Sequence, residues 1–239
     1  MFQLISDSLN RVPASARSKV INVNVPAEAQ SEFDKAQNAL QQNGGDHITE
    51  HIREAVGHLE KAIRICPAFA EAQLMLGTAY MDLQQWEQAE QVLRDTLKLD
   101  PKAANAFFAL GELYFLQSKF AEAEDVLTAG LAIEERSCEA HFTLARVYWK
   151  QSPLAKEAAQ SRSLLEKSYK EVNQSLRLNP KFAGAHVLKG NLLLRAGRGD
   201  DAIAEFQAYL SLDPRGEYAA QVREVIRRQK STSTSRSLP

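Results

Sequence analysis

The chain has 239 residues, of which 44% are hydrophobic and 25% are charged, and its 29 Lys and Arg residues nearly balance its 30 Asp and Glu residues. This composition is typical of a soluble folded protein and excludes a largely disordered one, and the net charge of −1 gives the whole chain no electrostatic reason to bind nucleic acid or membranes. The two cysteines cannot form a disulfide framework, and no apolar run has the length of a membrane span.

Residues 1–28 are predicted to form an extension outside the main domain. They lack the continuous apolar segment of a signal peptide, which favours the cytoplasm, whereas a signal sequence further upstream would place the protein in the periplasm or cell envelope. Within this extension, Ile21, Val23 and Val25 alternate with asparagines, which is the pattern of a β-strand. Such a strand would pair with another chain, with an upstream domain, or with nothing.

Residues 29–69 predict two helices, and the turn between them contains a possible metal motif. His47, Glu50 and His51 spell H-x-x-E-H, the short motif of one class of zinc peptidases. His47 follows two glycines and an aspartate, so it lies at or before the start of the second helix, and no good third ligand is evident. We therefore expect an exposed insertion, no cofactor and no enzymatic activity; the alternative is a metal-dependent enzyme, which a stoichiometric metal count would reveal.

The following residues repeat with a period of 34. Tyr80, Tyr114 and Tyr148 follow one another at this step, and Gly77 and Gly111 share it. Each unit reads as two amphipathic helices and a turn, ended in several units by a proline that cannot continue a helix. A glycine in mid-helix costs about 1 kcal/mol relative to alanine, so its presence indicates that another helix approaches closely there.

This pattern resembles that of the tetratricopeptide repeat (TPR) family, W-x2-L-G-x2-Y followed by A-x3-F and then P. The matching residues are Leu76, Gly77, Tyr80, Ala89, Leu93 and Pro101; Leu110, Gly111, Tyr114, Ala123 and Leu127; Leu144 and Tyr148; and Gly190, Ala202, Phe206 and Pro214. The departures are Glu135 for the proline of one repeat, Ala145 for a glycine, Leu193 for a tyrosine, and Gln73, Phe107, His141 and His186 at the tryptophan position. We expect these two histidines to pack between paired helices.

The resemblance implies an all-α, right-handed superhelical solenoid of helix-turn-helix repeats. It covers a TPR domain at residues 29–229, with repeats at 29–69, 70–103, 104–137, 138–182 and 183–216, a capping helix at 217–229, and a disordered tail at 230–239. The capping helix is expected because the open end of a solenoid needs a cover with one polar face.

The fourth repeat is enlarged. From Tyr148 to Pro180 the chain spans 32 residues, 11 more than the 21 from Tyr80 to Pro101. Ser152 and Pro153 have the character of a helix cap and a first-turn proline, which predicts one long helix starting there. A broken pair of helices is the alternative.

In the family, the first helix of each repeat lines a concave face that holds an extended peptide or a partner helix. Helical geometry, at 100° per residue, then selects the residues opposite the core stripe, to which neighbouring aromatic residues are added. The partner-binding candidates are Glu71, Met75, Thr78, Asp82, Asn105, Glu112, Phe115, Glu139, Arg146, Trp149, Lys150, Asn191 and Arg195.

Acidic candidates precede basic ones along this set. We therefore expect a bipolar groove that prefers a peptide with a basic stretch at the second and third repeats and an acidic end at the fourth and fifth. The predicted function is a non-catalytic protein-interaction scaffold for a protein or peptide, with self-association also open. The alternative is an assembly or accessory factor of a bacterial cell-envelope complex.

Overall fold

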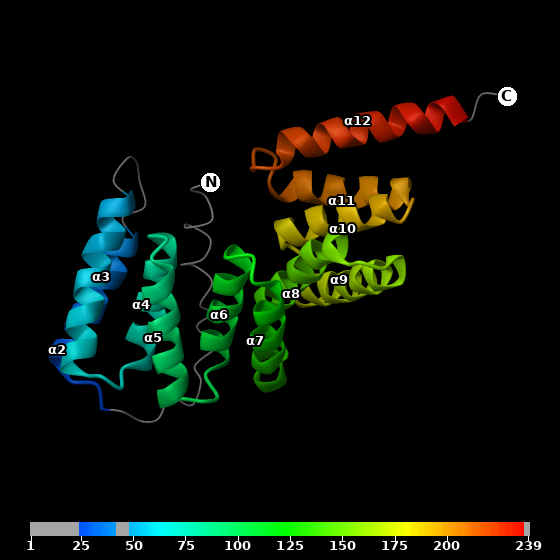
Figure 1. Cartoon of the computed structure of the whole chain (residues 1–239). Helices are drawn as coiled ribbons and strands as arrows, with labels where there is room; N and C mark the ends of the chain where they lie inside the picture. Colours follow the sequence, from blue (N-terminus) through cyan, green and yellow to red (C-terminus); the bar gives the residue numbers. More distant parts are fainter. Residues whose placement is uncertain (1–23, 42–47, 237–239) are drawn as a thin grey trace. The chain divides into compact units, whose positions relative to one another are not determined.

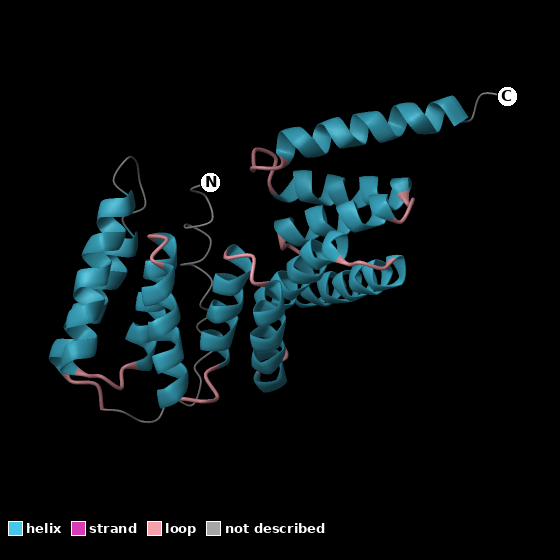
Figure 2. Cartoon of the chain, viewed as in Figure 1, coloured by secondary structure: helices cyan, strands magenta, loops and turns pink. Residues whose placement is uncertain are grey.

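The structure, a computed structural model, describes residues 24–41 and 48–236. Over these ranges it contains eleven α-helices, one 3-10 helix and no β-strand (Figures 1 and 2). The predicted all-α fold class is therefore confirmed. The strand pattern at 20–25 falls mostly outside the described residues, and residues 24 and 25 are not part of a strand.

The chain divides into two compact units, and the division falls within helix α7 (Phe120–Ile133). Unit 1 comprises residues 1–119 and 125–133, and unit 2 comprises residues 120–124 and 134–239. The other helices of unit 1 are α2 (Ala27–Gln41), α3 (Ile48–Ile65), α4 (Ala70–Asp82), α5 (Trp86–Leu99) and α6 (Ala104–Leu116). Those of unit 2 are α8 (Cys138–Gln151), the 3-10 helix η1 (Ser152–Leu154), α9 (Ala158–Leu178), α10 (Ala183–Arg195), α11 (Gly199–Leu212) and α12 (Ala219–Arg236).

Within each unit the helices pack in consecutive antiparallel pairs. In unit 1, α2 pairs with α3 and α4 pairs with α5, and the pairs stack because α3 also packs on α4 and α5 on α6 (Figure 1). In unit 2, α8 pairs with α9 and α10 pairs with α11, while α9 packs on α10 and α11 on α12. This is the packing expected of stacked helix-turn-helix repeats, in which each pair buries its apolar stripe against its neighbours.

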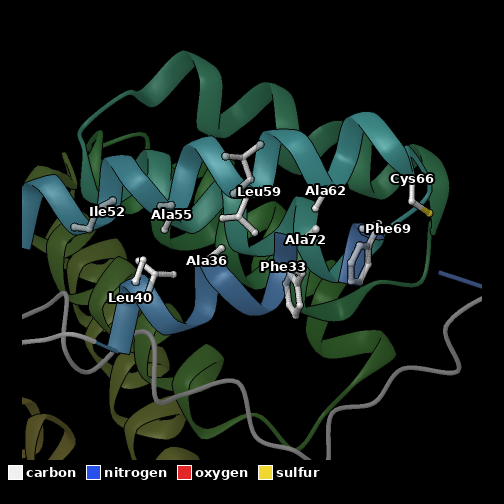
Figure 3. Close-up of a cluster of buried hydrophobic side chains, with 14 residues drawn as sticks. Phe33, Ala36, Leu40, Ile52, Ala55, Leu59, Ala62, Cys66, Phe69 and Ala72 are labelled. Carbon is white, nitrogen blue, oxygen red and sulfur yellow. The ribbon is translucent and has the colours of Figure 1, made fainter. Parts of the chain in front are cut away.

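The first repeat, whose sequence matches the repeat pattern least well, has a closely packed core. Figure 3 shows side chains of α2 and α3 interleaving with Phe69, which precedes α4, and with Ala72 of α4. Ala36 and Ala55 have no exposed surface, and the rings of Phe33 and Phe69 lie 4.9 Å apart. Small residues in the middle and aromatic residues at one end therefore set the spacing of the helices.

The mid-helix glycines lie where the two helices of a repeat are closest. A Cβ atom on Gly77 would lie 2.6 Å from Leu93 Cδ2, and one on Gly190 would lie 2.5 Å from Phe206 Cε1. Gly111 has the same relationship to Leu127. The prediction of a close helix approach at these glycines is confirmed, because the space beside each is filled by a large side chain from the second helix of its own repeat.

In the fourth repeat a different pair of residues forms the close contact between the first and the second helix. The first helix of this repeat carries Ala145 where the second, third and fifth repeats carry glycine, and Ser168 of α9 lies opposite it. The Ser168 hydroxyl donates a 2.8 Å hydrogen bond to the Ala145 carbonyl, and neither residue has exposed surface. A larger residue on one helix is therefore matched by a smaller one on the other.

The turns between paired helices use the left-handed backbone region. Gln84, Ser118 and Gly197 occupy the same position of three repeats and have φ values of 58°, 60° and 74°. Only glycine adopts this conformation without a steric cost, so two of the three turns carry a strained residue.

The enlarged repeat contains the long helix that the sequence predicted, but this helix starts later than predicted. Ser152 keeps a right-handed helical conformation and its hydroxyl donates to the Trp149 carbonyl at 3.0 Å, so it extends the end of α8 rather than capping a new helix. Pro153 then lies within η1, and α9 begins only at Ala158 after an extended Glu157. The predicted start at Ser152 is wrong, but α9 is one continuous helix of 21 residues, longer than the 14 residues of α5, α7 and α11, so the long helix itself is observed.

The last helix is longer than predicted. We expected a capping helix at 217–229 followed by a disordered tail at 230–239, but α12 runs Ala219–Arg236 and covers part of that tail. Between Gly216 and Pro239 there is no glycine or proline to end the helix. Its buried Ala219 and Val222 pack on the cluster around Phe206 and Tyr209, as a capping helix requires.

Candidate functional site

In unit 1 the candidate residues lie on α4 and α6. Glu71 is exposed, and the other candidates of this unit, namely Met75, Thr78, Asp82, Asn105, Glu112 and Phe115, are half-buried. The Thr78 hydroxyl donates a 2.8 Å hydrogen bond to the Met75 carbonyl within the helix, so its oxygen is partly engaged. Met75 itself packs against the core cluster of the first two repeats. The candidates therefore form the border between core and solvent rather than a fully exposed surface.

Asp82 is the acidic group of unit 1 with the most unusual environment. Burial raises its pKa to about 7. No hydrogen bond or ion pair reaches its carboxylate from residues 24–41 or 48–229. A carboxylate in this state would be stabilised by a cation supplied from outside the unit, such as a lysine or arginine side chain of a partner.

In unit 2 the candidate cations rest on aromatic rings. The guanidinium carbon of Arg146 lies 5.5 Å from the centroid of Phe142, and that of Arg195 lies 5.5 Å from the centroid of Trp149. Both distances fall within the range of a cation–π interaction. Phe142 in turn packs edge to face on Phe182, with 4.7 Å between ring centroids. These contacts link α8 with α10 and hold the two arginines in defined positions.

The same contacts fix the relative direction of the two first helices of unit 2. Near the start of α8, Phe142 touches the position that a Cβ of Gly184 would occupy, 3.2 Å away, at the start of α10. At the other end, Trp149 of α8 is met by Arg195 of α10. The helices α8 and α10 therefore run parallel, and their C-terminal ends bring Trp149, Lys150 and Arg195 to one region.

The remaining candidates of unit 2 have different roles. Lys150 is exposed and Asn191 is half-buried. Glu139 lies in the first turn of α8, where a carboxylate favours the positive end of the helix dipole, and it is near the capping Ser137, at 3.5 Å. Glu139 thus has a structural role in starting α8, which the periodicity did not reveal.

Two further residues of this region belong to the candidate site but were not among the residues selected from the sequence. Ser152 lies within 3.5 Å of an Arg195 guanidinium nitrogen, and Leu154 is 68% exposed, the most exposed of the large apolar residues in the described ranges. Both belong to η1, which the sequence did not predict. Helix periodicity could not find them because they lie outside a regular helix, although the length of the insertion pointed to the segment.

Three of the four residues at the tryptophan position make one recurring contact. The His141 and His186 Nε2 atoms lie 3.0 and 2.9 Å from the carbonyl oxygens of Glu135 and Pro180, six residues earlier. The Gln73 side chain makes the same contact by donating to the Pro67 carbonyl at 2.8 Å. Each histidine also lies 2.6 Å from a carboxylate of the second helix of its repeat, Glu171 or Glu205. These histidines join the turn to both helices, in agreement with a packing role.

The possible metal motif falls largely outside the described residues. His47 is one of the undescribed residues 42–47, and α3 begins at Ile48. His51 lies in α3 with Nδ1 3.9 Å from Glu54, one turn away. Within the described ranges no group of three His, Cys, Asp or Glu side chains is placed to hold a metal ion.

Neither cysteine forms a disulfide. Cys66 and Cys138 are both free thiols, and Cys66 is buried. Burial, with the neighbouring Glu139, raises the pKa of Cys138 to about 11, so this thiol stays protonated at neutral pH. None of the helices in the described ranges combines the length and apolar character that crossing a membrane needs.

The repeats identified by period and packing match a known family in sequence. The sequence model of the tetratricopeptide repeat matches residues 74–135 and 165–217. The chain belongs to the tetratricopeptide repeat family. The resemblance inferred from the spacing of Gly77, Gly111 and the tyrosines is therefore confirmed, and this TPR protein has the protein-binding character that is general to the family.

Solved TPR structures have the same fold. MamA (residues 41 to the end) from Desulfovibrio magneticus RS-1 is 20% identical, covering 81% of this chain and 99% of that one, with a TM-score of 0.60. TTC0263 from Thermus thermophilus is 17% identical over 84% and 98% of the two chains, with a TM-score of 0.62. YrrB, a TPR protein with an unusual peptide-binding site, is 15% identical over 82% and 92%, with a TM-score of 0.54. No curated protein matches the chain in sequence.

Proposed function

We propose that this TPR protein is a non-catalytic scaffold that binds a peptide or partner helix on the faces formed by the first helices of its repeats. The observation that carries the proposal is the pair of aromatic-backed arginines, Arg146 and Arg195, on the parallel helices α8 and α10. A guanidinium stacked on a ring loses little side-chain entropy when it binds a carboxylate, because its position is already fixed. YrrB offers a precedent within the fold, since it has a peptide-binding site.

The two units are proposed to prefer opposite charges. In unit 1, Glu71, Asp82 and Glu112 supply acidic groups; burial raises the pKa of Asp82, and no cation among the described residues pairs with its carboxylate. In unit 2, Arg146, Lys150 and Arg195 supply basic groups. A basic stretch of a partner would therefore bind to unit 1 and an acidic stretch to unit 2, as the bipolar groove predicts. Electrostatic complementarity of this kind sets specificity and association rate more than total affinity.

The proposal is tested by comparing captured partners of the wild type and of the double variant Arg146→Glu, Lys150→Glu. Reversing two charges should abolish the capture of an acidic partner from native lysate while leaving the helical circular dichroism spectrum unchanged. The matched control is Arg162→Glu, Lys170→Glu, which reverses two exposed cations on α9. If the same partners bind the wild type and both variants, the binding surface of unit 2 is elsewhere and the bipolar arrangement is wrong.

A further inference from the structure

We propose that unit 2 recognises an acidic residue next to a large apolar residue in the partner peptide, at a subsite made by Arg195, Trp149 and Leu154. The inference rests on the proposed function, because it specifies which peptide the α8 and α10 face would take. It adds the segment η1, which comes from the insertion in the fourth repeat and is not part of the regular repeat pattern.

The charged half of the subsite is Arg195. Its guanidinium carbon lies 5.5 Å from the Trp149 ring centroid, and its Nη1 atom lies 3.5 Å from the Ser152 hydroxyl oxygen. A guanidinium held over a ring keeps donors at its edge for a carboxylate, and that geometry suits paired hydrogen bonds. A place in the last turn of α10 explains a positive residue there through the helix dipole, but not its stacking on a residue of α8.

The positive charge of the subsite is not neutralised within the unit. From the residues that the structure describes, no carboxylate comes within ion-pair distance of Arg195 or of Lys150. Both side chains are exposed. The exposed Arg198, by contrast, pairs with Asp201 one helical turn away, at 2.7 Å. The charge complement of the subsite is therefore an acid supplied by a partner.

The apolar half of the subsite is Leu154. It is 68% exposed and stands two residues from Ser152, which is buried. The Ser152 hydroxyl donates to the Trp149 carbonyl at 3.0 Å, so η1 is attached directly to the end of α8, and Pro153 stiffens it. An apolar residue of a peptide whose acidic side chain pairs with Arg195 would thus find Leu154 and the Trp149 ring within one or two residues.

The regular repeats do not offer this apolar group. At the position of Ser152 they have Gln84, Ser118 and Gly197 in the left-handed conformation, and the chain turns at once into the second helix. In the fourth repeat the right-handed Ser152 lets the chain continue through η1 before α9 begins at Ala158. The insertion therefore places an exposed leucine two residues after the serine whose hydroxyl lies 3.5 Å from Arg195.

The fluorescence of Trp149 reports on the subsite directly. Trp86 is the other tryptophan, so Trp86→Phe provides a background in which the signal comes from Trp149 alone. The probes are three short peptides with blocked ends: Glu-Glu-Leu-Glu-Glu, Glu-Glu-Gly-Glu-Glu and Gln-Gln-Leu-Gln-Gln. We expect the first to bind most tightly, with the other two weaker by about tenfold, and its affinity to fall as salt is added.

Variants in the Trp86→Phe background separate the two halves of the subsite. Arg195→Gln should weaken the acidic leucine peptide by about tenfold or more, and Leu154→Ser by about threefold to tenfold, so that this variant no longer distinguishes leucine from glycine in the peptide. The matched controls are Arg177→Gln and Leu212→Ser, which change an exposed arginine of α9 and a partly exposed leucine of α11. Both controls should bind like the background protein.

The outcomes distinguish this inference from the proposed function. If Arg195→Gln weakens binding but leucine and glycine peptides bind equally to the background protein, the apolar subsite is overturned and the charged face stands. If none of the peptides changes the Trp149 signal, the subsite is overturned, and the lysate comparison with Arg146→Glu, Lys150→Glu decides the proposed function independently. If the controls weaken binding as much as Arg195→Gln does, binding follows the overall charge and the subsite is also overturned.

Discussion

Gly77 and Leu93 approach so closely that a methyl group on Gly77 would lie 2.6 Å from Leu93 Cδ2. Leu93 has no exposed surface, so it cannot swing into solvent. We expect Gly77→Ala to lower the free energy of unfolding by about 1–3 kcal/mol, because overpacking outweighs the helix propensity that alanine adds. Urea unfolding followed by circular dichroism measures the change.

Gly57 provides the control for this prediction. It lies within α3, and a Cβ atom there would meet nothing within 4 Å. Gly57→Ala should therefore raise the free energy of unfolding by about 0.5–1 kcal/mol through helix propensity alone. If Gly77→Ala and Gly57→Ala stabilised the protein by the same amount, the close contact between Gly77 and Leu93 would not contribute to stability.

The left-handed turns predict stabilising substitutions. Gln84 and Ser118 adopt φ values of 58° and 60°, which cost a residue with a Cβ atom about 1–2 kcal/mol. We expect Gln84→Gly and Ser118→Gly each to raise the free energy of unfolding by about 0.5–1 kcal/mol, since glycine offsets part of the gain through its larger entropy in the unfolded chain. In the third turn, where φ is 74°, Gly197→Ala should be destabilising. Thermal unfolding shows whether each of the three variants melts above or below the wild type.

The environment of Asp82 predicts a pH dependence. Burial raises its pKa from 3.8 to about 7, so the folded state binds this proton more tightly than the unfolded state does. Its contribution to stability is therefore present below pH 3.8 and is lost progressively as the pH rises to about 7. Asp82→Asn should stabilise the protein by about 1–3 kcal/mol above this range and hardly at all near pH 4. Melting temperatures of both proteins across that window test the prediction, and a difference that does not change with pH would contradict it.

The environment of Glu205 predicts the opposite dependence of stability on pH. It is partly buried, which acts to raise its pKa, but hydrogen bonds from Lys189 at 2.8 Å and His186 at 2.6 Å hold the pKa below its ordinary value. Its stabilising contribution is then complete above the ordinary value of 4.5 and is lost as the pH falls through the lowered pKa. We expect Glu205→Gln to lower the free energy of unfolding by about 1–2 kcal/mol at neutral pH, with the difference from wild type shrinking in acid.

Acid unfolding curves of wild type and Glu205→Gln measure this difference. Asp200→Asn is the control, because it removes an exposed carboxylate from the first turn of the same helix, α11. A Glu205→Gln variant that loses no more stability than this control at neutral pH would show that the contacts to Lys189 and His186 do not stabilise the repeat.

The parts of the fold that follow a period were predictable from the sequence. The spacing of Tyr80, Tyr114 and Tyr148 fixes which face of each first helix is buried, and Gly77 marks a close approach that the structure contains. The sequence did not predict η1, because the choice between a helix start and a 3-10 turn at Ser152 depends on whether its hydroxyl bonds forward or back, and it bonds back to Trp149. It also placed the end of the last helix too early, since a serine- and threonine-rich segment has weak helix propensity but no residue that stops a helix.

The candidate site was predictable only as a list of positions. Periodicity selected Trp149 and Arg195 separately, because it gives the face of each helix. That the Arg195 guanidinium lies over the Trp149 ring depends on the register between α8 and α10, which is set by contacts such as that of Phe142 with Phe182. The burial of the Asp82 carboxyl group was also not predictable, since nothing local in the sequence distinguishes Asp82 from the exposed Glu71.

In the fourth repeat the first helix carries a larger residue, Ala145, and the second helix a smaller one, Ser168, than the glycine and leucine of the second and third repeats. This pairing limits how the repeats can be rearranged by recombination. A crossover in the loop between two helices of a repeat would join the first helix of one repeat to the second helix of another. Joining Ala145 to a helix carrying a leucine like Leu93 would overfill the contact, and joining Gly77 to a helix carrying a serine like Ser168 would leave a void there. The heritable module of this chain is therefore the helix pair, and viable crossovers are expected in the loops that connect one pair to the next.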